Sequence, residues 1–257
     1  MKFIILCFPR TGSTLLVSAL GAVGGVRQGM EIFNPVLEGD APYVTWRKRV
    51  LAELFGEQAS FLDAHGYLDG ERFELTRLAE RFFADFDGTK IMYDQLALES
   101  GVWNYLRAMP DLRVIVLRRN IVEAAVSFRI AMETNVWHVA AADAGPSPPR
   151  LVFEPGYISW FYDHFCARES RVTALFPRQN VLEIDYRDLV DAWPETIGAA
   201  QRWIGIEPVA VDPPFRRGAP GAASELIANY DEVRAHYASH PVLARHFASA
   251  APQGRRS

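Results

Sequence analysis

The chain has 257 residues, of which 49% are hydrophobic and 23% are charged, and its formal net charge at pH 7 is −4. This length suits one α/β domain with a sizeable core, and the acidic balance argues against a protein that coats nucleic acid. No apolar run approaches the roughly 20 residues of a membrane span, so we expect no membrane span and a cytoplasmic location.

The first expected element is a strand at residues 2–8, which a loop at 9–14 connects to a helix at 15–23. The strand sequence is short, apolar and unbroken, which is typical of a strand buried on both faces of a parallel sheet. The first backbone N–H groups of the following helix have no partner within it, so they form an anion site. The loop adds a fixed charge, a flexible backbone and two hydroxyls, from Arg10, Gly12, Ser13 and Thr14. An ordinary turn with a hydroxyl cap is the alternative.

This loop lacks the Gly-Lys pair of the nucleoside triphosphate loop GxxxxGK[ST]. Pro9 to Thr14 instead resembles the 5′-phosphosulfate loop of sulfotransferases, which use 3′-phosphoadenosine 5′-phosphosulfate (PAPS). The loop of that family reads Pro-[Lys/Arg]-[Ser/Thr]-Gly-[Ser/Thr]-Thr, and this chain fits it at every position. The resemblance implies that five residues bind the phosphosulfate: Arg10, Thr11, Gly12, Ser13 and Thr14.

Glu31 lies between Met30 and Ile32, where the chain should return to the carboxyl edge of the sheet. Its setting Glu-x-Phe-Asn-Pro resembles that of the catalytic glutamate in trehalose, nodulation-factor and protein-tyrosine sulfotransferases. The resemblance implies that Glu31 is the general base, with Arg10 as its catalytic partner on the leaving group. A solvated loop glutamate is the alternative.

Residues 46–86 are predicted to be mostly helical, and Thr89 to Tyr93 to form a second strand. A Gly-x-Lys entry to this strand is common in bacterial sulfotransferases, which implies that Lys90 approaches the acceptor or the sulfuryl group. A solvated lysine at a strand end is the alternative. A helix is expected from Tyr93 to Met109.

The segment 113–117 predicts a strand, and Asn120 with Glu123 predicts the capped start of a helix that runs to about Thr134. Arg119 then lies at the strand end and Ser127 two turns into the helix. An arginine fork and a hydroxyl suit a phosphate dianion. Sulfotransferases bind the 3′-phosphate with Arg-Asn after a strand and a serine eight positions past the arginine, and this chain has that spacing. A surface ion pair is the alternative for Arg119.

Trp137 and His138 are expected to shape the acceptor pocket, with His138 as the second candidate for the general base. Residues 139–150 are rich in alanine and proline with little to bury, so a mobile loop is expected there. A long helix is predicted at 157–176, a strand with its turn at 180–189, and an amphipathic helix at 193–204. Tyr186 resembles the family's adenine-contacting tyrosine, with core packing as the alternative.

Near the end, Arg216, Arg217 and Gly218 resemble the Arg-Lys-Gly that closes over the 3′-phosphate in many sulfotransferases. A helix is predicted at 224–237, where the sequence is similar to a signature of bacterial carbohydrate sulfotransferases, and a tail at about 251–257. Cys7 and Cys166 are expected as core residues in a reducing compartment.

The resemblance implies an α/β, three-layer, P-loop-like fold with a mostly parallel central sheet of four to five strands flanked by helices. It implies one domain, 1–257, that transfers a sulfuryl group from PAPS to a hydroxyl of a carbohydrate, a glycolipid or another small acceptor. No metal is expected, because no cluster with ligand spacing is visible. A kinase on the same architecture and a non-catalytic adenosine bisphosphate-binding protein remain alternatives, and the oligomeric state, a homodimer included, stays open.

Overall fold

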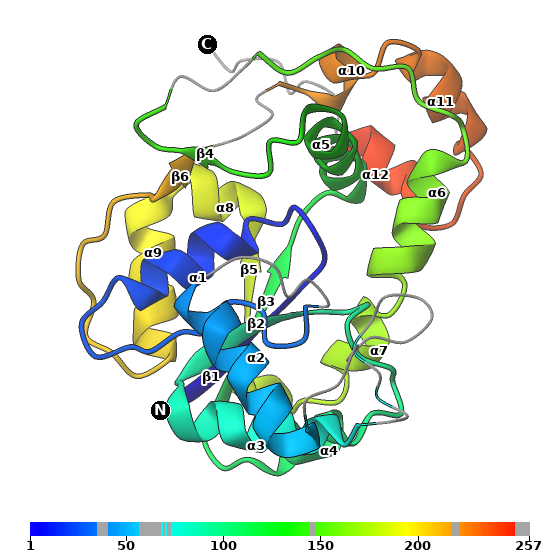
Figure 1. Cartoon of the computed structure of the whole chain (residues 1–257). Helices are drawn as coiled ribbons and strands as arrows, with labels where there is room; N and C mark the ends of the chain where they lie inside the picture. The colour runs from blue at the N-terminus through cyan, green and yellow to red at the C-terminus, as the bar shows by residue number, and fades with distance from the viewer. Residues whose placement is uncertain are drawn as a thin grey trace.

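A four-stranded parallel sheet forms the centre of the chain (Figure 1). The computed structural model describes residues 1–34, 41–56, 68, 70, 73–143, 147–216 and 221–249. The strands are β1 (Lys2–Cys7), β2 (Gly88–Met92), β3 (Leu112–Arg118) and β5 (Val181–Asp185). Their order is β2-β1-β3-β5, and each neighbouring pair is parallel. The predicted α/β class and mostly parallel sheet of four to five strands are confirmed, with four strands.

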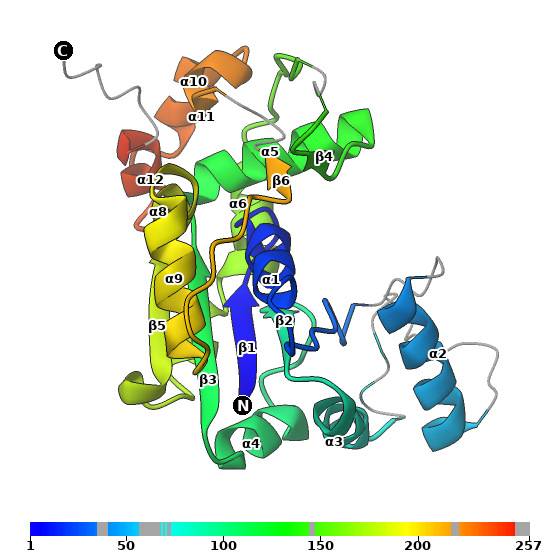
Figure 2. The same ribbon diagram turned by 90° about the vertical axis from the view of Figure 1, so that its left-hand side faces the viewer.

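Helices cover both faces of this sheet (Figure 2). Successive side chains of a strand point to opposite faces, so Ile4 and Leu6 belong to one core while Ile5 and Cys7 belong to the other. The first core includes α3 (Leu75–Asp85), α4 (Gly101–Ala108) and α5 (Ile121–Thr134); the second includes α1 (Ser13–Gly21) and α9 (Trp193–Trp203). The expected three layers are therefore present, with α2 (Pro42–Phe55) packed outside α3.

The carboxyl ends of all four strands meet at one edge of the sheet, because the strands are parallel. The loop after β1 carries Arg10 and Gly12, the turn after β2 carries Asp94, and the step from β3 to α5 carries Arg119. The strand β5 leads directly into α8 (Tyr186–Asp191). Open α/β sheets bind ligands at this edge.

The helix predicted from Tyr93 to Met109 is wrong in its first half. Residues 93–100 form turns, and α4 begins only after Ser100, whose hydroxyl accepts a hydrogen bond from the backbone N–H of Val102 at 3.4 Å. The backbone N–H of Gln95 donates to the carbonyl of Met92 at 3.1 Å, which turns the chain immediately after β2. The turn places Asp94 and Gln95 in the cavity wall at the carboxyl edge of the sheet.

The long helix predicted at 157–176 is interrupted. It comprises α6 (Tyr157–Phe161), the π-helical segment η1 (Tyr162–Cys166) and the short α7 (Glu169–Thr173), and a 3₁₀ turn η2 (Arg178–Asn180) precedes β5. A π-helical turn adds a residue to the helical repeat and often lies at a functional site. Pattern reading does not detect it, because the apolar spacing on either side remains helical.

The predicted helix 224–237 is two helices, α10 (Ala223–Leu226) and α11 (Tyr230–His236). Between them the backbone pairs with another segment: the N–H of Leu151 donates to the carbonyl of Leu226, and that of Ala228 donates to the carbonyl of Leu151. These bonds replace helical ones. The predicted tail, 251–257, lies outside the described residues.

A second, two-stranded sheet lies beside the edge of the central sheet. The strands β4 (Val139–Ala140) and β6 (Phe215–Arg216) pair antiparallel. The predicted mobile loop 139–150 therefore begins as a strand, since the backbone groups of β4 find partners in a distant segment. Residues 144–146 of that loop lie outside the described part of the chain.

The C-terminal helix α12 (Leu243–Ser249) stabilises the start of α5. The Asn120 side-chain amide donates to the carbonyl of His246 at 2.7 Å, and the backbone N–H of Ile121 donates to Nδ1 of His246 at 3.4 Å. Nδ1 can accept this bond only when it carries no proton. Burial, and next the charge of Arg245, lower the pKa of His246 to about 4.

Acidification is therefore expected to weaken the packing of α12. The pKa of His246 is lower in the folded chain than in the unfolded chain, so its contribution is complete above about pH 6.5 and is lost as the pH falls toward about 4. Because the half-buried ring is screened by solvent, we expect an effect on the order of 1 kcal/mol. Chemical denaturation of the wild type and His246→Asn between pH 7 and pH 4 measures the free energy of unfolding of each protein. If that free energy changes with pH equally in both proteins, His246 is not the group responsible.

Among the described residues, no helix combines the length and the apolar character needed to cross a membrane.

Candidate active site

The loop between β1 and α1 has a constrained backbone. Arg10 and Gly12 both have positive φ, 67° and 86°, and the Thr11 hydroxyl donates to the carbonyl of Phe8 at 3.0 Å. A Cβ atom on Gly12 would lie 2.9 Å from the ring of Tyr186, so glycine is needed here both for its φ and for the close approach. Positive φ in an arginine is uncommon, and such strain concentrates at functional sites.

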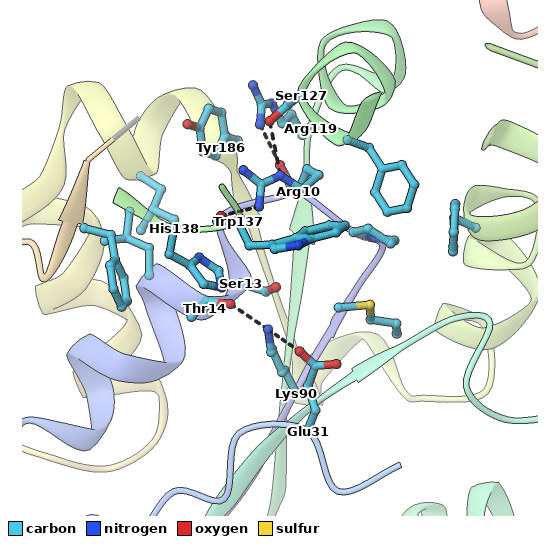
Figure 3. A pocket seen from close by; sticks show the side chains of 18 of the residues that line it. Arg10, Ser13, Thr14, Glu31, Lys90, Arg119, Ser127, Trp137, His138 and Tyr186 are labelled. Atoms are coloured by element: carbon cyan, nitrogen blue, oxygen red, sulfur yellow. Dashed lines mark hydrogen bonds and ion pairs between the residues drawn. The ribbon is translucent and has the colours of Figure 1, made fainter. Parts of the chain in front are cut away.

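The segments that carry the two predicted anion clusters are in direct contact (Figure 3). Nη1 of Arg119 donates to the backbone carbonyl of Arg10 at 2.6 Å, and Nε of Arg10 donates to the hydroxyl of Ser127 at 3.2 Å. The guanidinium of Arg119 lies 4.0 Å from the centre of the Tyr186 ring. Residues far apart in the sequence thus form one cationic group at the sheet edge.

The side chain of Arg10 also reaches the segment after α5. Its Nη1 donates to the carbonyl of Trp137 at 2.6 Å, and its guanidinium lies 5.9 Å from the centre of the Trp137 ring. Burial, and next the charge of Arg119, lower the pKa of Arg10 to about 10. Arg10 therefore keeps its charge at neutral pH, and its desolvation strengthens its attraction for an anion.

Glu31 and Lys90 form a buried ion pair at the other end of the site (Figure 3). Nζ of Lys90 lies 2.6 Å from Oε1 of Glu31 and donates to the hydroxyl of Thr14 at 2.7 Å. The side chains of Lys90 and Glu31 are 3% and 13% exposed. The solvated alternatives for these two residues are therefore wrong. Lys90 joins the carboxylate to the N-terminus of α1.

Two residues that the sequence reasoning did not assign to the site hold the Glu31 carboxylate. Asn34 and Gln95 each donate to its Oε2 at 2.9 Å. Gln95 is itself fixed, because its Oε1 accepts from the backbone N–H of Met92 at 3.1 Å. The spacing of three residues between Glu31 and Asn34 was a readable signal for one contact. No sequence signal pointed to Gln95, because its segment was predicted as helix.

One cavity of about 800 Å³ is lined by the loop residues Arg10 and Gly12 to Thr14, by Arg119 with Ser127, and by the Glu31–Lys90 pair. Figure 3 shows Arg119, Ser127 and Tyr186 at one end and Glu31 with Lys90 at the other. The aromatic and histidine side chains that also line it are Phe128, Trp137, His138, His164, Phe165, Tyr186, Trp193 and Phe215. Arg216 of β6 lines it too, whereas Arg217 and Gly218 lie outside the described residues. The cavity can thus hold a ligand with two anionic groups, one at the loop of Gly12 to Thr14 and one at Arg119 and Ser127.

His138 lies in the same cavity, and its ring centre is 5.3 Å from that of Phe215. Burial, and next the charges of Arg10 and Lys90, lower the pKa of His138 to about 4. The ring is therefore neutral at physiological pH and a weaker base than an ordinary histidine. Within the described ranges, His, Cys, Asp and Glu side chains form no group of three or more that could hold a metal ion.

Residues 3–210 match the profile described as the sulfotransferase family. Two proteins called Nodulation protein H are similar to the chain. The one from Rhizobium meliloti (strain 1021) is 24% identical over 93% of this chain and 92% of its own length; the one from Rhizobium tropici is 24% identical over 98% and 96%. Among solved structures, mouse sulfotransferase SULT7A1 complexed with PAP is 13% identical, with a TM-score of 0.49 and coverage of 96% of this chain and 88% of that one.

Proposed function

Because the chain belongs to the sulfotransferase family, we propose that it transfers a sulfuryl group from PAPS to a hydroxyl of a carbohydrate or glycolipid. The observation that carries this proposal is the single cavity with Arg10, Arg119 and Ser127 at one end and the Glu31–Lys90 pair at the other. Arg119 and Ser127 suit a 3′-phosphate, while Arg10 and the loop at the start of α1 suit the phosphosulfate. Both groups line the same cavity of about 800 Å³, which is to hold the nucleoside between the two anionic groups.

The donor nucleotide is proposed to bind through charge-assisted hydrogen bonds. The Arg119 fork and the Ser127 hydroxyl approach the 3′-phosphate from two elements, and such bonds contribute about 1.5 to 3 kcal/mol each. The Tyr186 ring, already stacked on Arg119, offers a face for the adenine. The role of Arg216 in closing over this end rests on the resemblance, together with its place in the cavity wall.

Transfer forms a bond between the acceptor oxygen and sulfur and breaks the bond between sulfur and the 5′-phosphate oxygen, which leaves with the electron pair. Glu31 is proposed to take the proton from the acceptor hydroxyl. Asn34 and Gln95 hold Oε2 of Glu31, so the carboxylate cannot rotate away and Oε1 keeps lone-pair capacity for that proton. A positioned general base contributes about 10²- to 10⁴-fold.

Lys90 and Arg10 are proposed to stabilise the charge that develops on the transferred group and the leaving phosphate. An ammonium group has three protons, and Lys90 directs two of them to Glu31 and Thr14. The third is available to a sulfuryl oxygen. Donors that are already in place act without reorganisation, and loss of one typically costs ~10²- to 10³-fold in rate.

Glu31 is a better candidate for the base than His138. The Glu31 carboxylate has three fixed contacts at the buried end of the cavity, whereas the basicity of His138 is reduced by its surroundings. His138 and Trp137 are proposed to shape the acceptor pocket, as part of its wall. The carbohydrate acceptor is supported by the resemblance of residues 224–237 to a signature of bacterial carbohydrate sulfotransferases.

Two measurements test this function. Calorimetry with adenosine 3′,5′-bisphosphate (PAP) should show binding, and transfer of labelled sulfate from PAPS should be found in a screen of carbohydrate and small hydroxyl acceptors. Absence of heat with PAP would overturn the proposal.

We also expect sulfuryl transfer to persist in EDTA, because the proposed chemistry is carried by protein side chains. Activity that EDTA abolishes and magnesium restores would favour the kinase-like alternative.

A further inference from the structure

Asp94 is a second carboxylate in the cavity, and the proposed transfer does not use it. It lies on the turn directly after β2, next to Gln95, which holds Glu31. Asp94 is partly exposed and lines the cavity together with Glu31, while its Oδ1 atom is buried. The hydrogen bond that acts on this carboxylate comes from the backbone N–H of Asp94 itself, so the carboxylate keeps acceptor capacity for a ligand in the cavity.

The surroundings of Asp94 suit a hydroxyl donor. The charged groups that act on its carboxylate are Glu31, from the loop after α1, and Arg168, which follows η1. Burial is the largest influence and raises the pKa of Asp94 to about 6; the hydrogen bond from its own backbone lowers that pKa, the charge of Glu31 raises it and the charge of Arg168 lowers it. The hydroxyl of a neutral acceptor can donate to this carboxylate without adding charge to the cavity.

Aromatic side chains line the cavity along with the two carboxylates. Phe128 packs with its ring centre 5.7 Å from that of Trp137 and 5.2 Å from that of Phe165, and all three line the cavity. Aromatic faces suit the C–H groups of a sugar ring, and carboxylate oxygens suit its hydroxyls. Glu31 and Asp94 can each receive one acceptor hydroxyl, and a monohydroxy acceptor supplies only one.

We propose that Asp94 is a specificity-determining residue that accepts a hydrogen bond from a second hydroxyl of the acceptor, while Glu31 receives the hydroxyl to be sulfated. This inference rests on the proposed function and narrows its acceptor to a polyol such as a sugar. Binding sites of this kind discriminate strongly, because an analogue without the second hydroxyl leaves the Asp94 carboxylate without that donor. The turn at 92–95 fixes the spacing between the two carboxylates through Gln95, which bonds to both Met92 and Glu31.

The test measures binding, so it does not depend on turnover. Methyl glucoside, its single deoxy analogues, a glucose disaccharide and 4-nitrophenol are titrated into wild type and Asp94→Ala, with and without PAP. We expect the sugar that binds wild type to lose about 10- to 150-fold in affinity in the variant. One deoxy analogue should bind both proteins equally weakly, because it lacks the hydroxyl that Asp94 receives. Binding of 4-nitrophenol should not change.

Glu99→Ala, which removes an exposed carboxylate from the same loop, is the matched control and should bind every probe as wild type does. Asp94→Asn, which keeps the shape and one acceptor oxygen, should lose less affinity than Asp94→Ala. Equal losses for sugar and 4-nitrophenol, or a melting temperature that falls together with sugar affinity, would assign Asp94 a structural role and overturn the inference. Binding of 4-nitrophenol without any sugar would also overturn it. Failure of PAP to bind would instead count against the proposed function.

Discussion

Replacing Glu31 with glutamine is expected to lower the rate of sulfuryl transfer by about 10²- to 10⁴-fold while PAP affinity stays within a few fold of wild type. Glutamine fills the same space but cannot take the proton from the acceptor hydroxyl. The nucleotide should still bind, because its proposed contacts with Arg119 and Ser127 lie at the other end of the cavity. Single-turnover transfer of labelled sulfate and calorimetry with PAP measure the two quantities separately.

The same substitution removes the carboxylate that neutralises buried Lys90, so stability must be measured as well. Breaking a buried ion pair by removing one partner costs about 3 to 5 kcal/mol. The double variant Glu31→Gln/Lys90→Met removes the uncompensated charge and should recover most of the melting temperature without recovering transfer. Glu207→Gln, at an exposed position, is the control. A folded Glu31→Gln enzyme with wild-type turnover would show that another group is the base.

The contiguous motifs were the most predictable part of the site. The strand, the loop at Arg10 to Thr14 and the helix follow one another within a few residues, so their geometry is local and the pattern reports it. The same holds for Asn120, whose side chain accepts a hydrogen bond from the backbone N–H of Glu123 at 3.1 Å and caps α5 as predicted. The parallel sheet then brings the two motifs to one edge. The local capping pattern and the parallel order of the strands therefore explain why the two motifs could be predicted to lie close together.

The Glu31 end was less predictable, because its contacts join segments that are distant in sequence. Lys90 lies on β2 while Thr14 begins α1, so the burial of Lys90 depends on how β1 and β2 pair. Gln95 and Asp94 were hidden by the helix predicted over them. Their apolar neighbours fit a helical period, but the Met92–Gln95 hydrogen bonds turn the chain there, and the backbone N–H of Tyr93 donates to the carbonyl of Cys7 at 3.1 Å. Periodicity describes burial along one segment and does not report hydrogen bonds that divert backbone groups from a helix.

Replacing Arg119 with alanine is expected to weaken PAP binding by roughly 10- to 150-fold for each lost charge-assisted bond, and to change the binding of adenosine 5′-phosphate far less. The difference between the two ligands is the 3′-phosphate. Arg119 is preorganised for that group, since its bond to the Arg10 carbonyl and its stacking on Tyr186 fix the guanidinium plane. Arg119→Lys keeps the charge without the fork and should recover only part of the affinity.

Arg118→Ala is the matched control for this experiment. Arg118 is the preceding residue, but its side chain is 44% exposed and pairs with Glu169 and Glu183 at the surface, so its loss should leave both nucleotides bound as in wild type. Removal of Arg119 also deletes its ion pair with Glu123, which keeps its pair with Arg187 at 3.2 Å, and exposes one face of Tyr186, which would weaken adenine binding. That indirect effect would reduce the affinities for PAP and adenosine 5′-phosphate alike. A selective loss for PAP therefore assigns Arg119 to the 3′-phosphate, whereas equal losses would remove it from that role.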